Sequence, residues 1–416
     1  MAEQHEKALV PQIRFTGFTD PWEQRKLGEV ARRVTRKNEN GDSDLPLTIS
    51  AQYGLVDQRT FFNSQVASKD MSGYFLLHRG EFAYNKSTST DSPWGAIKRL
   101  EKYDMGCVST LYICFELLSG DPDFLVTYYE TDRWYKSVQL IAAEGARNHG
   151  LLNIAPDDFF ETQICIPKRI DEQRRIGAFF DRLDSLITLH QGKYDKLCVL
   201  KKSMLDKMFP KGGSLYPEIR FAGFTDPWEQ RKLGEVARRV TRKNENGDSD
   251  LPLTISAQYG LVDQRTFFNS QVASKDMSGY FLLHRGEFAY NKSTSTDSPW
   301  GAIKRLEKYD MGCVSTLYIC FELLSGDPDF LVTYYETDRW YKSVQLIAAE
   351  GARNHGLLNI APDDFFETQI CIPKRIDEQR RIGAFFDRLD SLITLHQRKL
   401  ELLRNIKKSM LDKMFV

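Results

Sequence analysis

The chain has 416 residues, 41% of them hydrophobic, and its 57 basic and 57 acidic side chains give a formal net charge of zero. This length predicts two or more domains, and the zero net charge means that any nucleic-acid binding must come from local basic patches. Seven cysteines without the close spacing of a metal site, no apolar signal region, and no run near the roughly twenty apolar residues of a membrane span lead us to expect a reduced, cytoplasmic protein with no membrane partner.

A long internal repeat dominates the sequence. Residues 13–191 recur as residues 219–397, and within this stretch only Thr16 differs, its counterpart being Ala222. The copies then diverge, from GKYDKLCVL in the first to RKLELLRNI in the second, before KKSMLDKMF returns in both. The repeat is a duplicated unit and not a solenoid, because solenoid repeats are far shorter.

The first copy begins with a pattern that predicts a helix. Asp20 or Thr19 could cap a run that Pro21 opens, and the apolar residues of this run continue at helical spacing to Val34. Short strand-like stretches separated by glycine-containing turns follow. They cover residues 45–50, 73–77, 81–85, 95–100 and 108–117.

A second helix and a further strand complete the globular part of the copy. Pro122 starts the predicted helix, which includes Phe124 and Val138 on its apolar face. Residues 145–154 form a loop, and residues 161–168 form another strand. Each copy is therefore predicted to be a mixed α+β globule followed by a long helix.

The run from Ile170 to Phe209 predicts one long helix, and residues 376–415 repeat it. Its apolar or bulky residues alternate at spacings of three and four, which is typical of helices that pack along one seam. These residues are Ile176, Phe180, Leu183, Ile187, His190, Tyr194, Leu197 and Met204, with Ile382, Phe386, Leu389, Ile393 and His396 as counterparts in the second copy. A helix of roughly 60 Å, at about 1.5 Å per residue, needs an equally long partner. We therefore predict that the two helices pack together along this helix seam, with the histidines as packing residues and not ligands.

The order of the motifs resembles a known family. GEV near the start, LTISAQYGLVDQ, GYFLLHRGEFAYNKS, GAIKRL, GCVSTLYICF, EGARNHGLLNI, IPKRIDEQRRIGAFFDRLDSLITLHQ and KKSMLDKMF occur in this order in both copies. This order resembles the specificity (S) subunit of type I restriction–modification enzymes, and the resemblance covers essentially the whole chain.

The resemblance implies an α+β fold with two mixed α/β target recognition domains and two long conserved helices, packed as an antiparallel coiled coil with pseudo-twofold symmetry. The recognition domains would be residues 1–168 and 214–374, and the conserved spacer helices residues 169–213 and 375–416. Each domain would read one half of a split site in double-stranded DNA. The helices would set the distance between the halves and bind two methyltransferase (M) subunits, with restriction (R) subunits as optional partners. The chain itself would bind no cofactor, and S-adenosylmethionine, ATP and Mg²⁺ would bind to the partner subunits.

The motifs of nucleotide and methyl-transfer chemistry are missing from the sequence. It contains no GxxxxGK[ST], no asparagine-proline-proline-aromatic motif and no glycine cluster of the dinucleotide-binding type. A weak nuclease-like pattern joins Asp157 to Glu161, but Gln163 stands where a lysine is needed. We interpret this pattern as a helix cap or turn. The chain is therefore predicted to be a DNA-binding subunit and not an enzyme.

Three loops in each copy concentrate side chains that suit DNA contacts. Arg, Lys, Asn, Gln, Ser and Thr read base edges, and phosphates accept hydrogen bonds from Lys, Arg, Ser, Thr and backbone amides. The candidates in the first copy are Ser50, Gln52, Tyr53, Gln58, Arg59, Lys86, Ser87, Thr88, Ser89, Arg147 and Asn148. Those in the second copy are Ser256, Gln258, Tyr259, Gln264, Arg265, Lys292, Ser293, Thr294, Ser295, Arg353 and Asn354. For each of them an exposed polar loop residue is an equal alternative, and Asn85 could equally hold a turn of the scaffold.

Near-identity of the copies has a consequence for the target. Two equal readers related by antiparallel helices would face the duplex in opposite senses, so we expect a gapped palindrome. Two alternatives stay open. The chain could be an assembly scaffold or a decoy that occupies methyltransferase subunits without tight DNA binding, which the zero net charge favours. It could also be a stand-alone nuclease, which only the weak pairing of Asp157 with Glu161 supports.

Overall fold

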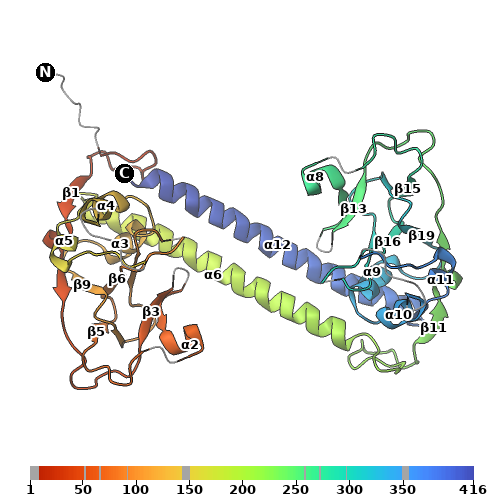
Figure 1. Ribbon diagram of the computed structural model, residues 1–416, viewed down its shortest axis with the longest axis horizontal. Helices are drawn as coiled ribbons and strands as arrows, with labels where there is room; N and C mark the ends of the chain where they lie inside the picture. Colours follow the sequence, from red (N-terminus) through yellow and green to blue (C-terminus); the bar gives the residue numbers. More distant parts are fainter. Residues whose placement is uncertain are drawn as a thin grey trace. The chain divides into compact units, whose positions relative to one another are not determined.

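The computed structural model describes residues 9–50, 53–64, 67–90, 92–142, 150–256, 259–270, 273–296, 298–348 and 356–416. The chain forms two compact units (Figure 1), the first made of residues 1–191 and 398–416 and the second of residues 192–397. Each unit thus contains one globular domain, the first part of the long helix that follows it and the last part of the other long helix. No helix in the ranges given has the length and apolar character to cross a lipid bilayer.

The same elements occur in the same order in both copies. In the first copy they are β1 (Glu23–Lys26), α1 (Leu27–Val30), β2 (Ala31–Val34), β3 (Leu47–Ser50), β4 (Gly54–Asp57), α2 (Gln58–Phe62), β5 (Phe75–His78), β6 (Phe82–Asn85), β7 (Ala96–Arg99), β8 (Met105–Val108), β9 (Ile113–Leu117), α3 (Pro122–Tyr128), α4 (Tyr135–Ala142), α5 (Pro156–Phe160), β10 (Gln163–Ile166) and α6 (Ile170–Lys207). In the second they are β11 (Glu229–Lys232), α7 (Leu233–Val236), β12 (Ala237–Arg239), β13 (Leu253–Ser256), β14 (Gly260–Asp263), α8 (Gln264–Phe268), β15 (Phe281–His284), β16 (Phe288–Asn291), β17 (Ala302–Arg305), β18 (Met311–Val314), β19 (Ile319–Leu323), α9 (Pro328–Glu336), α10 (Tyr341–Ala348), α11 (Pro362–Phe366), β20 (Gln369–Ile372) and α12 (Ile376–Met414).

Antiparallel pairing organises each domain. In the first unit β2, β9, β6 and β7 form a four-stranded sheet in that order, and β1–β10, β3–β4 and β5–β8 form two-stranded ribbons. The second unit repeats this topology. Successive side chains of β6 face opposite sides of the sheet. Phe82 and Tyr84 belong to one hydrophobic core, whereas Ala83 belongs to another. The sheet is covered on both faces, and the predicted α+β class is confirmed.

The predicted helix over residues 21–34 is wrong. This segment forms β1, the single turn α1 and β2. The strand β1 pairs with β10 in a register that places Glu23 opposite Ile166, and β2 pairs with β9. The helical spacing of apolar residues comes from α1 alone, where Leu27 and Val30 are buried. Because distant strands supply hydrogen-bond partners for the flanking backbone, tertiary pairing overrides the local helical pattern.

Two other predicted elements are divided. The stretch 108–117 contains the end of β8 and all of β9, separated by a turn that the Tyr112 N–H closes. The helix predicted from Pro122 to Val138 is split into α3 and α4, and the Thr131 hydroxyl donates to a carbonyl of α3 at 2.7 Å within the break. The short elements β4, α2 and α5 were not predicted.

The two long helices were predicted correctly, and they pack antiparallel within each unit (Figure 1). In the first unit Asp184 of α6 lies beside Lys407 of α12, and Gln191 lies beside Arg404. Residue numbers therefore rise along α6 in the direction in which they fall along α12, so the two helices are antiparallel in this unit. The second unit contains the equivalent ion pair between the start of α12 and the end of α6.

The predicted helix seam is buried at its domain-proximal end. Ile176 and Phe180 are each 1% exposed, and Leu183 is 6% exposed. Their counterparts Ile382, Phe386 and Leu389 are buried as well, and the half-buried seam positions are Ile187, His190, Ile393 and His396. The heptad pattern therefore identified the packed face of both helices.

The last turn of α12 closes the aromatic core of the first unit. The ring centroid of Phe415 lies 5.9 Å from that of Trp22, 5.6 Å from that of Phe124 and 6.0 Å from that of Phe180. These separations are in the range of favourable aromatic pairs. In the second unit, the end of α6 closes the core in the same way through Phe209, whose neighbours are Trp228, Phe330, Tyr334 and Phe386. Each domain core thus includes the KKSMLDKMF motif of the other copy.

The first turn of α6 is fixed to its domain by a buried carboxylate. Glu172 is 1% exposed and accepts two hydrogen bonds from the Arg14 guanidinium, at 2.6 and 2.8 Å, and a longer one from Trp22 Nε1. A buried charge needs such paired contacts to offset its lost hydration. Glu378 makes the same three contacts in the second unit.

A close approach of backbones follows one turn later. A Cβ placed on Gly177 would lie 2.7 Å from the Phe124 nitrogen and 2.8 Å from Asp123 Cβ, both in α3. Only glycine allows α6 to lie this close to α3. Gly383 has the same surroundings at the start of α9.

We expect Gly177→Ala to lower the free energy of unfolding by about 1–3 kcal/mol, because the added methyl group overlaps α3. Gly192 is the matched control in the same helix, since a Cβ there would meet nothing within 4 Å. Gly192→Ala should stabilise the chain by up to about 1 kcal/mol through its higher helix propensity. Urea unfolding followed by circular dichroism measures both changes, and equal effects of the two variants would contradict the close packing at Gly177.

Candidate nucleic-acid interface

The structure brings the predicted loops of the first unit together. We refer to them as the first loop (residues 50–59, described at 50 and 53–59), the second loop (residues 86–90) and the third loop (residues 145–154, described from 150 onward). The first and second loops meet at Tyr112, whose hydroxyl lies 3.5 Å from Thr48 Oγ1 in β3 and accepts a hydrogen bond from Asn85 Nδ2 at 3.3 Å. Asn85 Oδ1 in turn accepts from the Ser87 N–H at 3.0 Å. Asn85 therefore holds the turn that begins the second loop.

The second and third loops are joined by a short ladder. The N–H and the hydroxyl of Thr88 both donate to the Gly150 carbonyl, at 2.7 and 2.9 Å. The Leu152 N–H donates to the Lys86 carbonyl at 3.0 Å, and Lys86 Nζ donates to the Ile154 carbonyl at 3.2 Å. Side chains from three separate stretches of sequence thus belong to one connected edge of the domain.

Two candidates of the first loop, Ser50 and Tyr53, differ in their exposure to solvent. Ser50 is 6% exposed, and its hydroxyl accepts from the Tyr53 N–H at 3.2 Å, so this side chain supports the turn. Tyr53 itself is 55% exposed, and Lys102 Nζ lies 5.5 Å from the centroid of its ring. An exposed aromatic face beside an ammonium group is suited to a nucleic-acid surface.

Arg59 already has an internal partner. Its Nε and one terminal nitrogen donate to the two carboxylate oxygens of Asp57 at 3.1 and 3.0 Å, and this pairing holds the pKa of Asp57 below its usual range. A base contact by Arg59 would first require this pair to open. Gln58 is half-buried, and its Oε1 accepts no hydrogen bond from the residues that the structure describes.

The candidates of the second loop also differ in their exposure to solvent. Lys86 is half-buried with Nζ turned to a backbone carbonyl, and burial lowers its pKa. Ser87 and Ser89 are exposed, although the Ser89 hydroxyl also accepts from the Ser92 N–H at 3.1 Å. The serines face solvent, whereas the lysine and Thr88 hold the loop to its neighbour.

The described candidates of the second unit have the same surroundings as their counterparts in the first unit. Buried Ser256 supports the turn to Tyr259, which is 52% exposed, and Arg265 pairs with Asp263. The candidates Gln264, Lys292, Ser293, Thr294 and Ser295 occupy the same positions as their first-unit counterparts. The candidates Gln52, Arg147, Asn148, Gln258, Arg353 and Asn354 lie outside the described residues.

The nuclease-like pattern does not form a cluster. Asp157 lies in the first turn of α5 with its side chain 96% exposed, as the turn interpretation predicted, and its nearest cation is Arg33 at 3.9 Å. Glu161 pairs with Lys26 at 2.6 Å. Within the described ranges, no group of three or more His, Cys, Asp or Glu side chains is placed to hold a metal ion.

One solved structure shares this fold over nearly its whole length. A crystal structure of the type I restriction–modification system S subunit from M. genitalium has a TM-score of 0.57 at 13% sequence identity, and the match covers 98% of this chain and 99% of that one. The chain has the fold of a type I specificity subunit. The HsdS subunit from Thermoanaerobacter tengcongensis has a TM-score of 0.45 at 17% identity, covering 96% of this chain and 98% of that one. A chain from a study of complex assembly and conformational transition of the type I restriction–modification system has a TM-score of 0.44 at 17% identity, covering 95% and 97%. No protein-family model and no curated protein matches the sequence.

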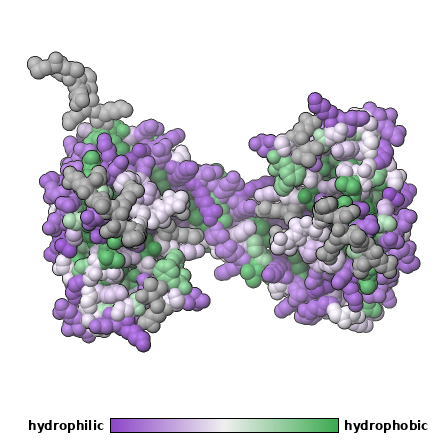
Figure 2. Space-filling view, viewed as in Figure 1, coloured by the Kyte–Doolittle hydropathy of each residue, from purple (hydrophilic) through white to green (hydrophobic). Residues whose placement is uncertain are grey.

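Sequence reasoning missed two features of this specificity-subunit fold. The role of Tyr112 has no signal in the sequence, because it depends on β3 and β6 ending on either side of one hydroxyl. The second feature is the short helix α2, which buries none of its side chains and exposes Phe61 and Phe62 by 46% and 49%. The surface of each unit is otherwise largely hydrophilic in the view of Figure 2. The paired phenylalanines at residues 61–62 were the available signal for α2.

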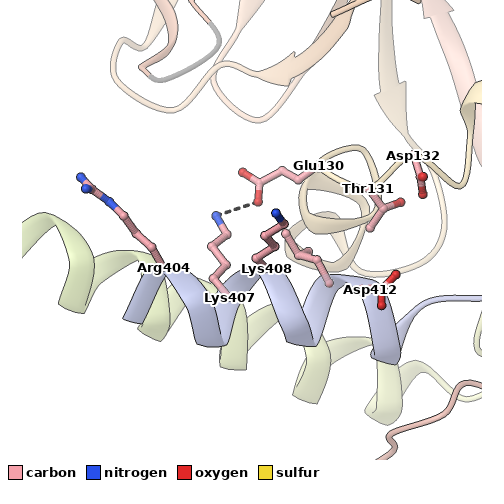
Figure 3. A pocket seen from close by; sticks show the side chains of 8 residues that line it. Glu130, Thr131, Asp132, Arg404, Lys407, Lys408 and Asp412 are labelled. Carbon is pink, nitrogen blue, oxygen red and sulfur yellow. Dashed lines mark ion pairs between the residues drawn. The ribbon is translucent and has the colours of Figure 1, made fainter. Parts of the chain in front are cut away.

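A cavity of about 360 Å³ in the first unit lies elsewhere, between residues 130–132 and the last turns of α12 (Figure 3). Lys407 lines it and donates to Asp184 of α6 at 2.6 Å, and it also lies 2.8 Å from Glu130 of the domain. Burial works against the charged form of Lys407, but its attraction to the two carboxylates outweighs this effect and raises its pKa. None of the lining residues belongs to the three loops. The cavity is therefore part of a junction that fixes the domain to both helices.

We expect Lys407→Met to lower the free energy of unfolding by about 1–3 kcal/mol, between the values for exposed and for buried ion pairs. Lys408→Met, one residue further on and exposed, is the control and should change it by less than about 0.5 kcal/mol. A raised lysine pKa stabilises the fold below the unfolded-state pKa of about 10.4, and this contribution is lost as the pH rises through the folded-state pKa. Denaturation curves should therefore give the same difference at every neutral pH, and a smaller one in strongly alkaline solution or in acid, where Asp184, whose pKa burial raises, becomes protonated. Equal effects of the two lysine variants would rule out the junction.

Proposed function

We propose that the chain is the DNA-recognition subunit of a type I restriction–modification complex. The observation that carries this proposal is the end-to-end likeness of its fold to a solved S subunit, over 98% of this chain and 99% of that one. In this proposal the chain makes the sequence-specific contacts, and two methyltransferase (M) subunits carry S-adenosylmethionine and methylate adenine. Restriction (R) subunits, where present, use ATP and Mg²⁺.

The connected loops support the assignment of the DNA-reading surface. Tyr53, Ser87 and Ser89 are exposed on loops that buried strands hold in place, and a rigid scaffold that presents polar loops is the usual design of a recognition surface. The side chains that hold the loops, such as Lys86 and Thr88, would act by positioning. Those that face solvent would contact the bases and phosphates.

The matching loops of the two units support a symmetric DNA target site. The contact of Thr88 with Gly150 recurs between Thr294 and Gly356, with the same N–H to carbonyl distance of 2.7 Å. Identical loops would read identical words. With the long helices antiparallel inside each unit, the site would be a gapped palindrome, in which one short word and its reverse complement flank a fixed spacer.

We expect the complex of this chain with its methyltransferase subunit to methylate adenine at one gapped palindrome. A base-modification map of DNA from cells that express both chains measures this directly. Methylation at an asymmetric site would keep the recognition role and contradict the equality of the two readers. A complex that assembles but methylates no defined site would contradict the proposed function.

One observation favours a second candidate. Arg59 is paired with Asp57, and Lys86 donates to a backbone carbonyl, so two of the predicted basic contacts have internal partners. A chain of zero net charge with few available cations would bind DNA weakly. It would then serve as an assembly scaffold, or as a decoy that occupies methyltransferase subunits.

Salt dependence of DNA binding separates the two candidates. A subunit that contacts phosphates loses affinity linearly with the logarithm of salt concentration, with a slope of about 0.9 per phosphate. We expect Lys102→Met combined with Lys308→Met to reduce the slope by roughly 2, about 0.9 for each lost contact, because both lysines lie beside the exposed tyrosines. Lys86→Met combined with Lys292→Met is the control and should leave the slope unchanged. A shallow slope for the unaltered complex would favour the scaffold or decoy.

A further inference from the structure

Tyr112 is placed where two candidate DNA-reading loops meet. Its ring packs against the smaller hydrophobic core of the first domain, which includes Leu47 and Val108. Its hydroxyl emerges between β3, which leads into the first loop, and the end of β6, which leads into the second. The ring therefore belongs to the scaffold, and the hydroxyl belongs to the interface.

The hydrogen-bond directions around this hydroxyl form a continuous path. Asn85 Nδ2 donates to the Tyr112 oxygen, which leaves the hydroxyl hydrogen available for Thr48 Oγ1. Asn85 Oδ1 accepts from the N–H of Ser87, and Ser87 forms a β-bridge with Leu151 of the third loop. One hydroxyl thus connects the supports of all three loops.

Among the described residues, no backbone hydrogen bond joins the first loop directly to the second. The hairpin of β3 and β4 is a separate two-stranded ribbon, whereas β6 lies in the four-stranded sheet. The hydroxyl of Tyr112 is a direct polar link between these two sheets at the loop ends. Because base recognition depends on side chains held to within about 0.5 Å, a change in this link alters which base edges the loops can reach together.

We propose that Tyr112 is a positioning residue that sets the target word of the first unit by fixing the first loop relative to the second. This inference rests on the proposed function, in which these loops read DNA. In the second unit the Tyr318 hydroxyl lies 3.5 Å from Thr254 Oγ1, and the Ser293 N–H donates to Asn291 Oδ1. Neither tyrosine needs to touch a base.

Because the chain is duplicated, the unaltered second unit of the same molecule serves as the control for the altered first unit. Tyr112→Phe keeps the ring in the core and removes only the hydroxyl, while the second unit stays unaltered. Co-expressed with the methyltransferase subunit, this variant is expected to methylate sites in which one half is the original word and the other half carries a substitution. We expect at least a tenfold increase in methylation of such sites over the unaltered chain. The other half of every site should stay unchanged.

Two further variants separate positioning from folding. Thr48→Val removes the side-chain contact of the Tyr112 hydroxyl with β3 with little change of shape, so it should admit some or all of the same substituted words, and the double variant should admit no wider set than Tyr112→Phe. Tyr74→Phe removes a hydroxyl that accepts from the Ser68 N–H at 3.3 Å, outside the link. It should leave the methylation map unchanged. Thermal unfolding of the tyrosine variants shows whether the fold is equally stable.

Each outcome decides the question. Substituted words confined to one half-site, shared by Tyr112→Phe and Thr48→Val, support the proposal. Original words methylated at the original rate in Tyr112→Phe overturn it. A uniform loss of methylation at the original words, with a lower unfolding temperature, assigns Tyr112 to folding and also overturns it. If the unaltered chain directs methylation to no defined site, the proposed function fails first and the inference falls with it.

Discussion

The burial of a helix end in an aromatic core is the interaction on which both units depend. Phe415 lies against Trp22, Phe124 and Phe180, and Phe209 occupies the same place in the second unit. Each core is therefore made from one domain, the start of one long helix and the end of the other. Since aromatic rings bury large apolar areas, a domain without the second helix would expose a large part of its core.

Polar contacts then fix the orientation of each domain on the long helices of its unit. Glu172 is paired with Arg14 in the first turn of α6, and Gly177 lets α3 lie against the same helix one turn later. Lys407 adds a third point, because it joins α12 to Asp184 and to Glu130 of the domain. Three contacts spread along the helices restrain rotation as well as separation.

Strand β6 connects the buried core to the start of the second loop. Phe82 and Tyr84 are fully buried, and Asn85 and Lys86 follow directly at the end of the strand. The second loop starts from this rigid point and holds the third loop through the Gly150 carbonyl. The first loop is joined to them by a hydroxyl group. This difference explains why a substitution at Tyr112 would alter the arrangement of the loops while the core remains intact.

Regular periodicity and repetition were enough to predict much of this protein. The repeat, both long helices, the buried face at Ile176 and Phe180, and most strands follow from local patterns, because side-chain burial in helices and strands has a fixed period. The grouping of polar residues also indicated the three loops. The failures share a cause. Residues 23–26 and 31–34, on either side of the single turn α1, became strands because β10 and β9 supply their hydrogen bonds.

Repetition and apolar periodicity alone indicate two nearly identical units, each with polar loops and a long helix that packs along one seam. Only the tertiary structure decided which loop side chains face solvent. Arg59 turned to Asp57, Lys86 turned to the carbonyl of Ile154, and the Tyr112 hydroxyl met Thr48, 64 positions earlier in the chain. The physical reason is that a hydrogen bond depends on which donors and acceptors meet in space. The spacing of apolar residues indicates only which face of its own helix or strand a residue lies on.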